Sequence, residues 1–180
     1  MILTGPQIRA EVESGNIKVD PFYPEQLNPN SYNFRLGRTL KKYKNYELDA
    51  YKPNPTVSWE MRDDGYVLQP KELVLGHIEE RIGSDMYVPI IKGRSSIGRL
   101  GIFIVITADL VDQGAHGQWT MMLSVVQPVR VYPGMLIGQM TFWLPYGEPM
   151  LYDGKYQGAH GPGESLGWQD APGTEGKNRS

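Results

Sequence analysis

The chain has 180 residues, which is about the size of one domain and long enough to bury one sizeable core. Its formal net charge of −2 gives no overall basic field, so binding along a nucleic-acid backbone is not expected. The absence of cysteine excludes disulfides, thiolate catalysis and zinc sites built on cysteine.

No segment predicts a membrane span or a secretion signal. The longest apolar stretch, Ile102 to Ile106, is far too short to cross a bilayer. The opening segment MILTGPQIRAEVES lacks both the basic region and the long apolar run of a signal peptide. We therefore expect a cytoplasmic protein without a membrane partner.

The first element predicted along the chain is a short N-terminal helix. Thr4 can cap this helix, and Gln7 completes a capping box with it. Leu3 can pack onto Ile8 as a hydrophobic staple. The helix should stop at Gly15.

Beyond the helix, the sequence favours short strands separated by turns. The 21 Gly and 14 Pro are spread among short apolar runs, and Asn28-Pro29-Asn30 predicts a turn. The spacing of the runs is typical of a jelly-roll or Greek-key barrel, so the predicted class is mostly β. Strands are predicted at residues 17–19, 31–36, 66–68, 73–78, 86–91, 102–107, 119–126, 129–132 and 135–143.

Two segments show no core pattern. Lys41 to Arg62 is charged and rich in tyrosine, and Pro53 and Pro55 oppose a regular core element, so we expect a surface excursion there. The end of the chain has glycine, proline and charge with little apolar periodicity, which predicts mobility unless a ligand or a neighbouring subunit orders it. We expect a barrel domain at residues 1–157 and a C-terminal lid or tail at residues 158–180.

One short segment concentrates groups that bind phosphate. Two guanidinium groups and two hydroxyl groups can converge on phosphate oxygens through charge-assisted hydrogen bonds, and the neighbouring glycines permit close backbone approach. The residues are Arg94, Ser95, Ser96 and Arg99. On spacing alone, the alternative is equally good: the serines cap a short helix and the arginines lie in solvent.

The segment GRSSIGRLGI, at residues 93–102, resembles the phosphate-binding segment of the dCTP deaminases and of the bifunctional dCTP deaminase-dUTPases. Five further stretches agree with this superfamily in the same order and cover most of residues 1–160. They are NPNSYNFRLG (28–37), KELVLGHIEERI (71–82), TADLVDQGAHG (107–117), YPGMLIGQMTF (132–142) and GKYQG (154–158). The resemblance implies a distorted jelly-roll β-barrel of the dUTPase-like type and a deoxypyrimidine triphosphate ligand. It also implies a homotrimer in which the serines and arginines of one chain face a nucleotide held mainly by another.

The resemblance also implies roles for residues outside the phosphate segment. Asp112 is expected to contact the deoxyribose and, as in the dUTPase branch, to orient the attacking water. Gln139 is expected near the phosphates, and Lys155 and Tyr156 are expected as C-terminal substrate contacts beneath a lid. Without the resemblance, these would be an ordinary turn aspartate, an outward-facing strand residue and a solvated loop lysine. Mg²⁺ is expected to bind through the substrate phosphates, without direct protein ligands.

The chain departs from the family where the base is expected. In the deaminases, a glutamate on the strand after the substrate loop is the proton shuttle for water attack on C4 of cytosine. Met122 takes that place here, and a thioether does not carry a proton at neutral pH. Asn33 stands where relatives usually have Asp, and Ala159 where many have Gln. Asp109 is the obvious replacement carboxylate, although an ordinary surface aspartate is the more frequent case.

Three functions follow from this pattern. The preferred one is hydrolysis of dUTP or dCTP to the monophosphate and diphosphate, with Asp112, Arg99 and Ser95 as catalytic residues. The second is dCTP deamination with Asp109 as the displaced base. The third is nucleotide binding or regulation without chemistry. His116 has no metal-ligand spacing and is given no catalytic role.

Overall fold

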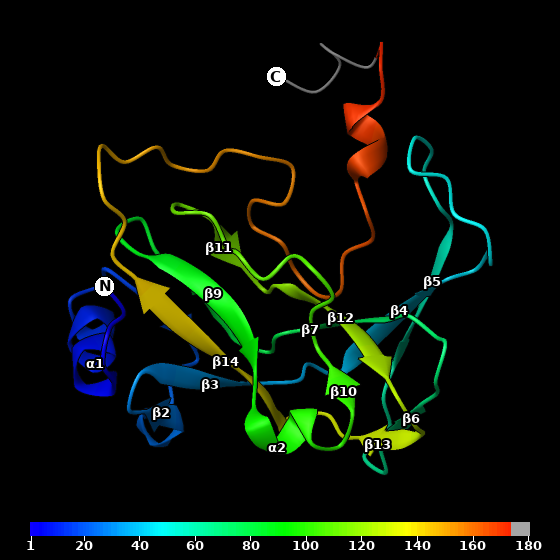
Figure 1. Ribbon diagram of the computed structural model, residues 1–180, viewed down its shortest axis with the longest axis horizontal. Coiled ribbons are helices and arrows are strands. Elements are labelled where there is room, and N and C mark those ends of the chain that lie inside the picture. Colours follow the sequence, from blue (N-terminus) through cyan, green and yellow to red (C-terminus); the bar gives the residue numbers. More distant parts are fainter. Residues whose placement is uncertain (174–180) are drawn as a thin grey trace.

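The computed structural model describes residues 1–173, in which short strands alternate with turns and loops (Figure 1). The predicted mostly β class with a short N-terminal helix is confirmed. No helix in this described part is long and apolar enough to span a membrane. The helices are α1 (Gly5–Glu13), the 3-10 helix η1 (Pro24–Gln26), α2 (Ser95–Gly98) and the 3-10 helix η2 (Gly167–Asp170). The strands are β1 (Lys18–Asp20), β2 (Leu27–Asn28), β3 (Ser31–Arg35), β4 (Thr39–Tyr43), β5 (Thr56–Glu60), β6 (Tyr66–Leu68), β7 (Val74–His77), β8 (Arg81–Gly83), β9 (Val88–Gly93), β10 (Ile102–Phe103), β11 (His116–Gly117), β12 (Thr120–Val125), β13 (Val129–Val131) and β14 (Leu136–Trp143).

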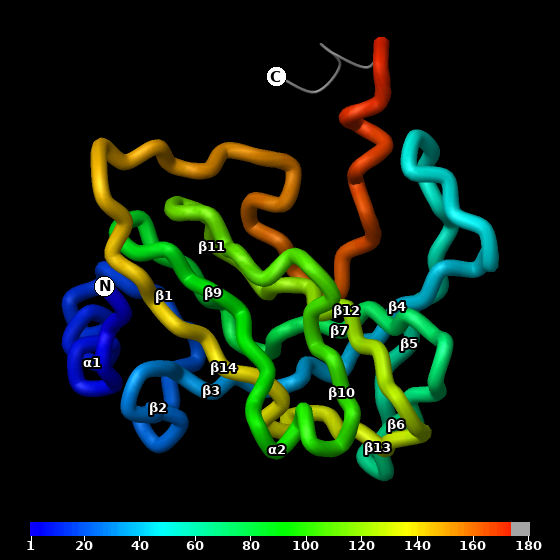
Figure 2. Tube along the Cα trace, viewed as in Figure 1, coloured from blue at the N-terminus to red at the C-terminus, as the bar shows by residue number. Residues whose placement is uncertain are grey.

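The strands pair in four antiparallel sheets. A four-stranded sheet has the order β2-β3-β14-β9, and a five-stranded sheet has the order β10-β12-β7-β4-β5. A three-stranded sheet, β1-β8-β11, and the pair β13-β6 complete the set. In the first sheet, β14 lies between β3 and β9, and α2 follows β9 directly in the chain (Figure 2). The position of α2 is therefore set by how β9 pairs with β14.

Alternating burial explains how the strands pack on the core. Along β12, the side chains of Met121, Leu123 and Val125 are buried, whereas every second residue between them is partly exposed. Successive side chains of a strand point to opposite faces, so this pattern places one face of β12 against the core. Met122 therefore lies on the outer face of the five-stranded sheet.

The start of α1 differs from the prediction. Thr4 is the N-cap residue, but its side chain makes no capping hydrogen bond. The Gln7 side chain donates instead to Glu11 Oε1 at 2.7 Å, so the predicted capping box is wrong. The Gly5 N–H already donates to the Pro29 carbonyl at 2.8 Å, and the next residue is a proline without an N–H. Few free donors are left for a side-chain cap.

Other predicted bounds are confirmed or corrected by local geometry. Gly15 follows α1 with a φ of 82°, a left-handed conformation that suits glycine at a helix end. The predicted turn at residues 28–30 joins β2 to β3. The predicted strand at 102–107 is wrong beyond its first two residues, because the chain then crosses toward β9, where Leu110 forms an isolated bridge with Ile90.

The expected surface excursion at residues 41–62 contains regular structure. β4 and β5 pair over five residues, from Thr39 opposite Glu60 to Tyr43 opposite Thr56. Both prolines of this segment lie in the loop between the strands, where they break no ladder hydrogen bond. The segment lies largely at the surface, as expected, but the strand pair in it was not predicted, and β5 forms an edge of the five-stranded sheet.

The described part of the tail is held by the chain's own sheet. The Ser165 N–H donates to Tyr43 Oη at 2.9 Å, and Lys41 forms an ion pair of 2.5 Å with Glu164. Residues 174–180 of the predicted lid lie outside the described residues. The division into a barrel and a lid stays a prediction.

A buried carboxylate joins β3 to the end of the β7-β8 segment. The side chain of Glu80 is fully buried, and its oxygens accept hydrogen bonds from Arg35 N at 2.9 Å and from Gln26 Nε2 at 3.0 Å. The Arg35 guanidinium lies 3.8 Å from the carboxylate. Burial nevertheless raises the pKa of Glu80 above its ordinary value of 4.5.

This raised pKa predicts a pH-dependent contribution to stability. The folded protein holds the Glu80 proton more tightly than the unfolded chain does, so the contribution of Glu80 to stability falls as pH rises from about 4.5 through the folded pKa. Glu80→Gln does not titrate, so its free energy of unfolding relative to wild type should increase with pH across that range. Urea unfolding at several pH values measures the difference.

Glu79→Gln, at an exposed neighbour, is the control and should show no such trend. If the difference in free energy of unfolding between Glu80→Gln and wild type stays constant with pH, the raised pKa of Glu80 is contradicted.

Candidate functional site

The predicted phosphate-binding residues lie together on α2. Ile97 is buried and anchors the helix, whereas Ser95, Ser96 and Arg99 are exposed. Arg94 is the N-cap residue, and its Nη1 donates to the Leu136 carbonyl at 3.1 Å. No side chain caps this helix, so the alternative in which the serines serve as caps is wrong. The hydroxyl groups and the second guanidinium are presented to solvent on one short turn.

Gln139 fixes the start of this segment. From the middle of β14, its Oε1 accepts a hydrogen bond from Ser31 Oγ at 2.7 Å, and its Nε2 donates to the Gly93 carbonyl at 3.0 Å. Ser31 belongs to β3, and Gly93 is the last residue of β9. The amide therefore bridges both neighbours of β14 one residue before Arg94. Gln139 therefore contacts the predicted phosphate segment through the Gly93 backbone, and its expected place near the phosphates stays a prediction.

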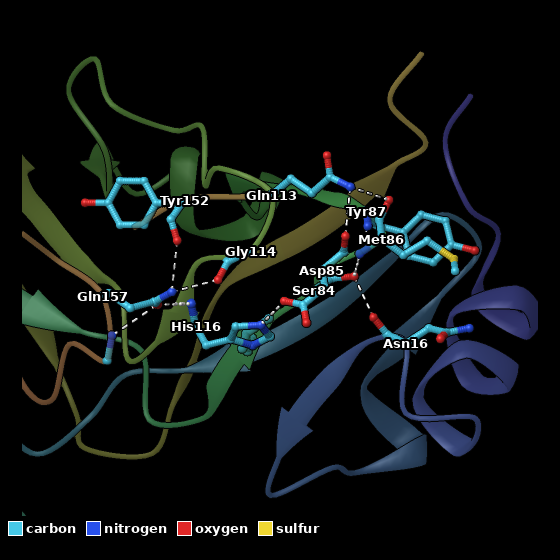
Figure 3. A network of polar contacts seen from close by, with 12 residues as sticks. Asn16, Ser84, Asp85, Met86, Tyr87, Gln113, Gly114, His116, Tyr152 and Gln157 are labelled. Atoms are coloured by element: carbon cyan, nitrogen blue, oxygen red, sulfur yellow. Dashed lines mark hydrogen bonds and ion pairs between the residues drawn. The ribbon is translucent and has the colours of Figure 1, made fainter. Parts of the chain in front are cut away.

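The loop that carries Asp112 is held by a separate polar network (Figure 3). The Asp112 side chain is exposed, and its carbonyl accepts from Ala115 N at 3.1 Å, which closes a turn. Beside it, Gln113 Nε2 donates to the Asp85 carbonyl at 2.8 Å, and Gln157 Nε2 donates to the Gly114 carbonyl at 2.8 Å. Side-chain amides on both flanks therefore fix the loop on which the exposed Asp112 side chain lies.

Lys155 and Tyr156 are engaged by the C-terminal segment. Lys155 Nζ forms an ion pair with Asp170, and Tyr156 Oη accepts from Leu166 N at 2.9 Å. The segment before them contacts the Asp112 loop through Tyr152 N, which donates to the Gln113 carbonyl at 2.8 Å. The two predicted substrate contacts thus neighbour the Asp112 loop, but each already has a partner within the chain.

The predicted site residues do not all lie close together within one chain. Val111 N donates to the Pro89 carbonyl at 2.9 Å, so the Asp112 loop lies at the beginning of β9, whereas α2 follows its end. A six-residue strand is roughly 17 Å long at the usual rise per residue. The α2 cluster with Gln139 and the Asp112 loop with Lys155 are therefore two separate groups within one chain.

The titratable side chains on the face around Met122 are already engaged: Lys41, in register with Leu75, is ion-paired with Glu164. Met122 lies opposite Leu75 in the β12-β7 pair, and Thr120 lies opposite His77. Burial lowers the pKa of His77, and its Nδ1 lies 3.0 Å from the Ile78 carbonyl. His77 was not singled out from the sequence, although its period-two spacing from Leu75 places both residues on one face.

The C-terminal segment covers this same face. Gly163 N donates to Thr120 Oγ1 at 2.8 Å, and Gly161 N donates to Gln118 Oε1 at 3.0 Å. Ala159 contributes only its backbone, since its carbonyl accepts from Gln118 N at 2.8 Å. The position expected to hold a glutamine in relatives therefore offers no polar side chain.

Asp109 is engaged elsewhere. Its carboxylate lies 2.5 Å from Lys92 Nζ, and this hydrogen bond lowers the pKa of Asp109. A carboxylate with a lowered pKa is a weaker proton acceptor. The Asp109 carbonyl also accepts from Ile91 N at 2.8 Å, which fixes the residue beside β9.

The described residues contain no group of three or more His, Cys, Asp or Glu side chains that could hold a metal ion.

Comparison with known proteins decides the family. A family model described as dCTP deaminase-like matches residues 2–144. The chain belongs to the dCTP deaminase-like family. Two relatives named dCTP deaminase, dUMP-forming, from Clostridium beijerinckii and Leptospira biflexa, are each 43% identical to it over 171 residues. These alignments cover 94% of this chain and 98% of each relative.

A solved structure supports the fold. The 2′-deoxycytidine 5′-triphosphate deaminase from Agrobacterium tumefaciens superposes with a TM-score of 0.64 at 21% identity. The match covers 80% of this chain but only 48% of that one. This likeness concerns the fold, and the family expected from the sequence motifs is confirmed by the family model and the 43% identical relatives.

Gln139→Ala tests how the phosphate segment is positioned. Removing the amide leaves Ser31 Oγ and the Gly93 carbonyl without their partners, so the free energy of unfolding should fall by roughly 1–2 kcal/mol. Chemical denaturation measures the loss. Gln127→Ala, at an exposed residue, should have little effect. Equal stability of both variants would contradict the bridging role.

Proposed function

We propose that this protein hydrolyses dUTP to dUMP and diphosphate and does not deaminate dCTP. The observation that carries the proposal is the contrast between two positions. Ser95, Ser96 and Arg99 are exposed together on α2, whereas Met122 stands where deamination requires a proton carrier. The name of the relatives supports treating deamination and triphosphate hydrolysis as two separate reactions. Forming dUMP from dCTP requires both loss of the amino group and cleavage of the triphosphate.

Hydrolysis adds water to the α-phosphorus and breaks the bond to the bridging oxygen, so that diphosphate leaves. Asp112 would orient the water, and its exposed carboxylate is free to do so. The hydroxyls of Ser95 and Ser96 and the guanidinium of Arg99 would bind the phosphate chain and stabilise its developing charge. Mg²⁺ would enter as part of the nucleotide complex and offset phosphate charge.

A complete site would need more than one copy of the chain. The α2 cluster and the Asp112 loop lie at opposite ends of β9. A homotrimer, as the family resemblance implies, would bring the α2 cluster of one copy to the Asp112 loop of another. The mass of the assembly in solution, measured by light scattering, tests this arrangement, and a monomer would contradict it.

Deamination by a substitute base has less support. Asp109 is bound to Lys92, and its pKa is lowered by that contact. Near Met122, His77 is buried and bonded to the backbone. Glu164 is paired with Lys41, and this hydrogen bond lowers the pKa of the carboxylate. Each of these groups already has a partner within the chain.

The first test measures products from both nucleotides. With dUTP and Mg²⁺, the protein should release dUMP and diphosphate; with dCTP, it should release no ammonia. Arg99→Ala should lower kcat/KM for dUTP by about 10²–10³-fold, since one charge-stabilising group is lost. Arg62→Ala, at an exposed arginine outside α2, is the control. Absence of monophosphate from both nucleotides would leave a binding protein without chemistry and would refute hydrolysis.

Restoring the carboxylate tests the missing activity. Met122→Glu should release ammonia from dCTP, because it returns a proton carrier to the outer face of β12. Met122→Gln has nearly the same shape without that capacity and should release none. Ammonia release by the wild type at the rate of Met122→Glu would show that position 122 does not limit deamination.

Asp170→Asn tests whether the ion pair between Lys155 and Asp170 competes with nucleotide binding. The substitution removes the charge that holds Lys155, so KM for dUTP should fall while kcat changes little, if phosphate binding requires Lys155 to be released. Asp153→Asn, at an exposed aspartate of the same segment, should leave KM unchanged. An unchanged KM for Asp170→Asn would refute competition between this carboxylate and the nucleotide.

A further inference from the structure

A surface cavity opens on the three-stranded sheet, away from α2. Its volume is about 300 Å³, and it is lined by Lys18, Asp20, Arg81, Ile82, His116 and Gly117. All three strands of the sheet contribute to this lining: β1, β8 and β11. Three of the six side chains are basic types, and one is acidic. The cavity therefore presents an excess of potential cations to a small ligand.

Lys18 and Arg81 are not ion-paired within residues 1–173, although Asp20 lines the same cavity. Asp20 lies directly opposite Arg81 in the β1-β8 register, but the two side chains form no ion pair. Across residues 1–173, neither Lys18 nor Arg81 makes any ion pair or side-chain hydrogen bond. Two exposed cations beside one cavity therefore remain available to an external anion.

A second cavity shows the contrasting case. It measures about 410 Å³ and is lined by Arg38, Arg62, Asp63 and Asp64. Arg38 lies 2.9 Å from Asp63, and Arg62 lies 3.7 Å from Asp64. Both arginines of this cavity are therefore ion-paired with carboxylates that line it. Of the two cavities, the one on the three-stranded sheet is lined by cations that are not ion-paired within residues 1–173.

His116 connects the cavity to the Asp112 loop. Its Nε2 lies 2.6 Å from Asp85 Oδ1, which orients the ring (Figure 3), and its Nδ1 is buried without a hydrogen-bond partner within the described chain. A Cβ at Gly83 would come within 2.3 Å of Nδ1, so glycine is what allows the ring to lie over β8. The His116 N–H donates to Gln157 Oε1 at 2.9 Å, and the same Gln157 side chain holds the Gly114 carbonyl.

We propose that this cavity binds a phosphate group through Lys18 and Arg81, with His116 forming part of its wall. The guanidinium and ammonium groups supply charge-assisted hydrogen bonds to the phosphate oxygens. Asp20 would accept a hydrogen bond from the P–OH of a singly protonated phosphate, a contact that sulfate cannot make at neutral pH. Because His116 also anchors Gln157, an occupied cavity would stabilise the loop that carries Asp112.

An NMR titration of the full-length protein tests the proposal. Inorganic phosphate, dUMP and sulfate are added separately at constant ionic strength set with sodium chloride, and amide signals of β1, β8 and β11 are followed. Phosphate should shift the signals of Gly83, His116 and Gly117, and sulfate should bind more weakly. The inorganic phosphate and dUMP titrations distinguish a free ion from a phosphate monoester as the occupant, and saturable binding of either supports the site.

Variants separate this cavity from the α2 cluster. Lys18→Ala/Arg81→Ala should weaken phosphate binding at these signals by about tenfold or more, the effect expected from losing two charged donors. Lys44→Ala/Arg62→Ala removes the same charge elsewhere and should leave it unchanged. Ser95→Ala/Arg99→Ala should also leave these shifts unchanged, whatever its effect on hydrolysis.

Three results would overturn the proposal. The first is phosphate shifts confined to residues 93–99. The second is equal loss of binding in the charge-matched control, which would indicate a general charge effect. The third is sulfate binding as tight as that of phosphate, which would remove the role of Asp20 and the proposed ligand class. Thermal melting of each variant verifies that it is folded.

Discussion

The phosphate segment depends on one side-chain amide that bridges three strands. Gln139 accepts from Ser31 on β3 and donates to Gly93 at the end of β9. β14 alone would fix β9 only by backbone hydrogen bonds, and these end where α2 begins. The Gln139 amide adds a side-chain hydrogen bond at Gly93, where β9 leads into α2. Arg94, the N-cap residue of α2, donates to the Leu136 carbonyl, so the orientation of α2 follows from the register of the four-stranded sheet.

The phosphate end and the base end of the expected nucleotide site differ in which of the expected side chains are present. At the phosphate end, the hydroxyls and the exposed guanidinium remain on a well-anchored turn. At the expected base end, Met122 and Ala159 stand where the family resemblance implies a glutamate and a glutamine, and His77 is buried with a lowered pKa. Charge stabilisation and water orientation suffice for phosphoanhydride hydrolysis, whereas deamination also needs a proton relay. This asymmetry is the physical reason to propose hydrolysis alone.

The sequence predicted the strands whose burial alternates cleanly. β12 and β14 lie within one residue of their predicted bounds because turn residues flank an alternating apolar pattern. β4 and β5 were missed because charged and aromatic residues build their partner contacts. Lys42, for example, pairs with Glu72 and lies 5.9 Å from the centre of the Trp59 ring. Long amphipathic side chains of this kind conceal a strand from a simple apolar pattern.

The candidate site was predictable in its parts but not in its arrangement. Residue types and family motifs located the α2 cluster and the Asp112 loop, yet their separation depends on where Leu110 returns to pair with Ile90, a contact no local pattern encodes. The buried Glu80 was also missed, because two consecutive glutamates suggest a solvated surface. Its period-two spacing from the buried Ile78 and Ile82 was the available signal.

The most direct test of this account is a crystal structure of the protein with Mg²⁺ and a non-hydrolysable dUTP analogue. The account predicts phosphate oxygens within hydrogen-bond distance of the Ser95 and Ser96 hydroxyls and of Arg99. It also predicts the fourth ring position of the base beside the thioether of Met122, with Asp112 from another copy of the chain near the α-phosphorus. A triphosphate bound away from α2, or a carboxylate facing that ring position, would contradict it.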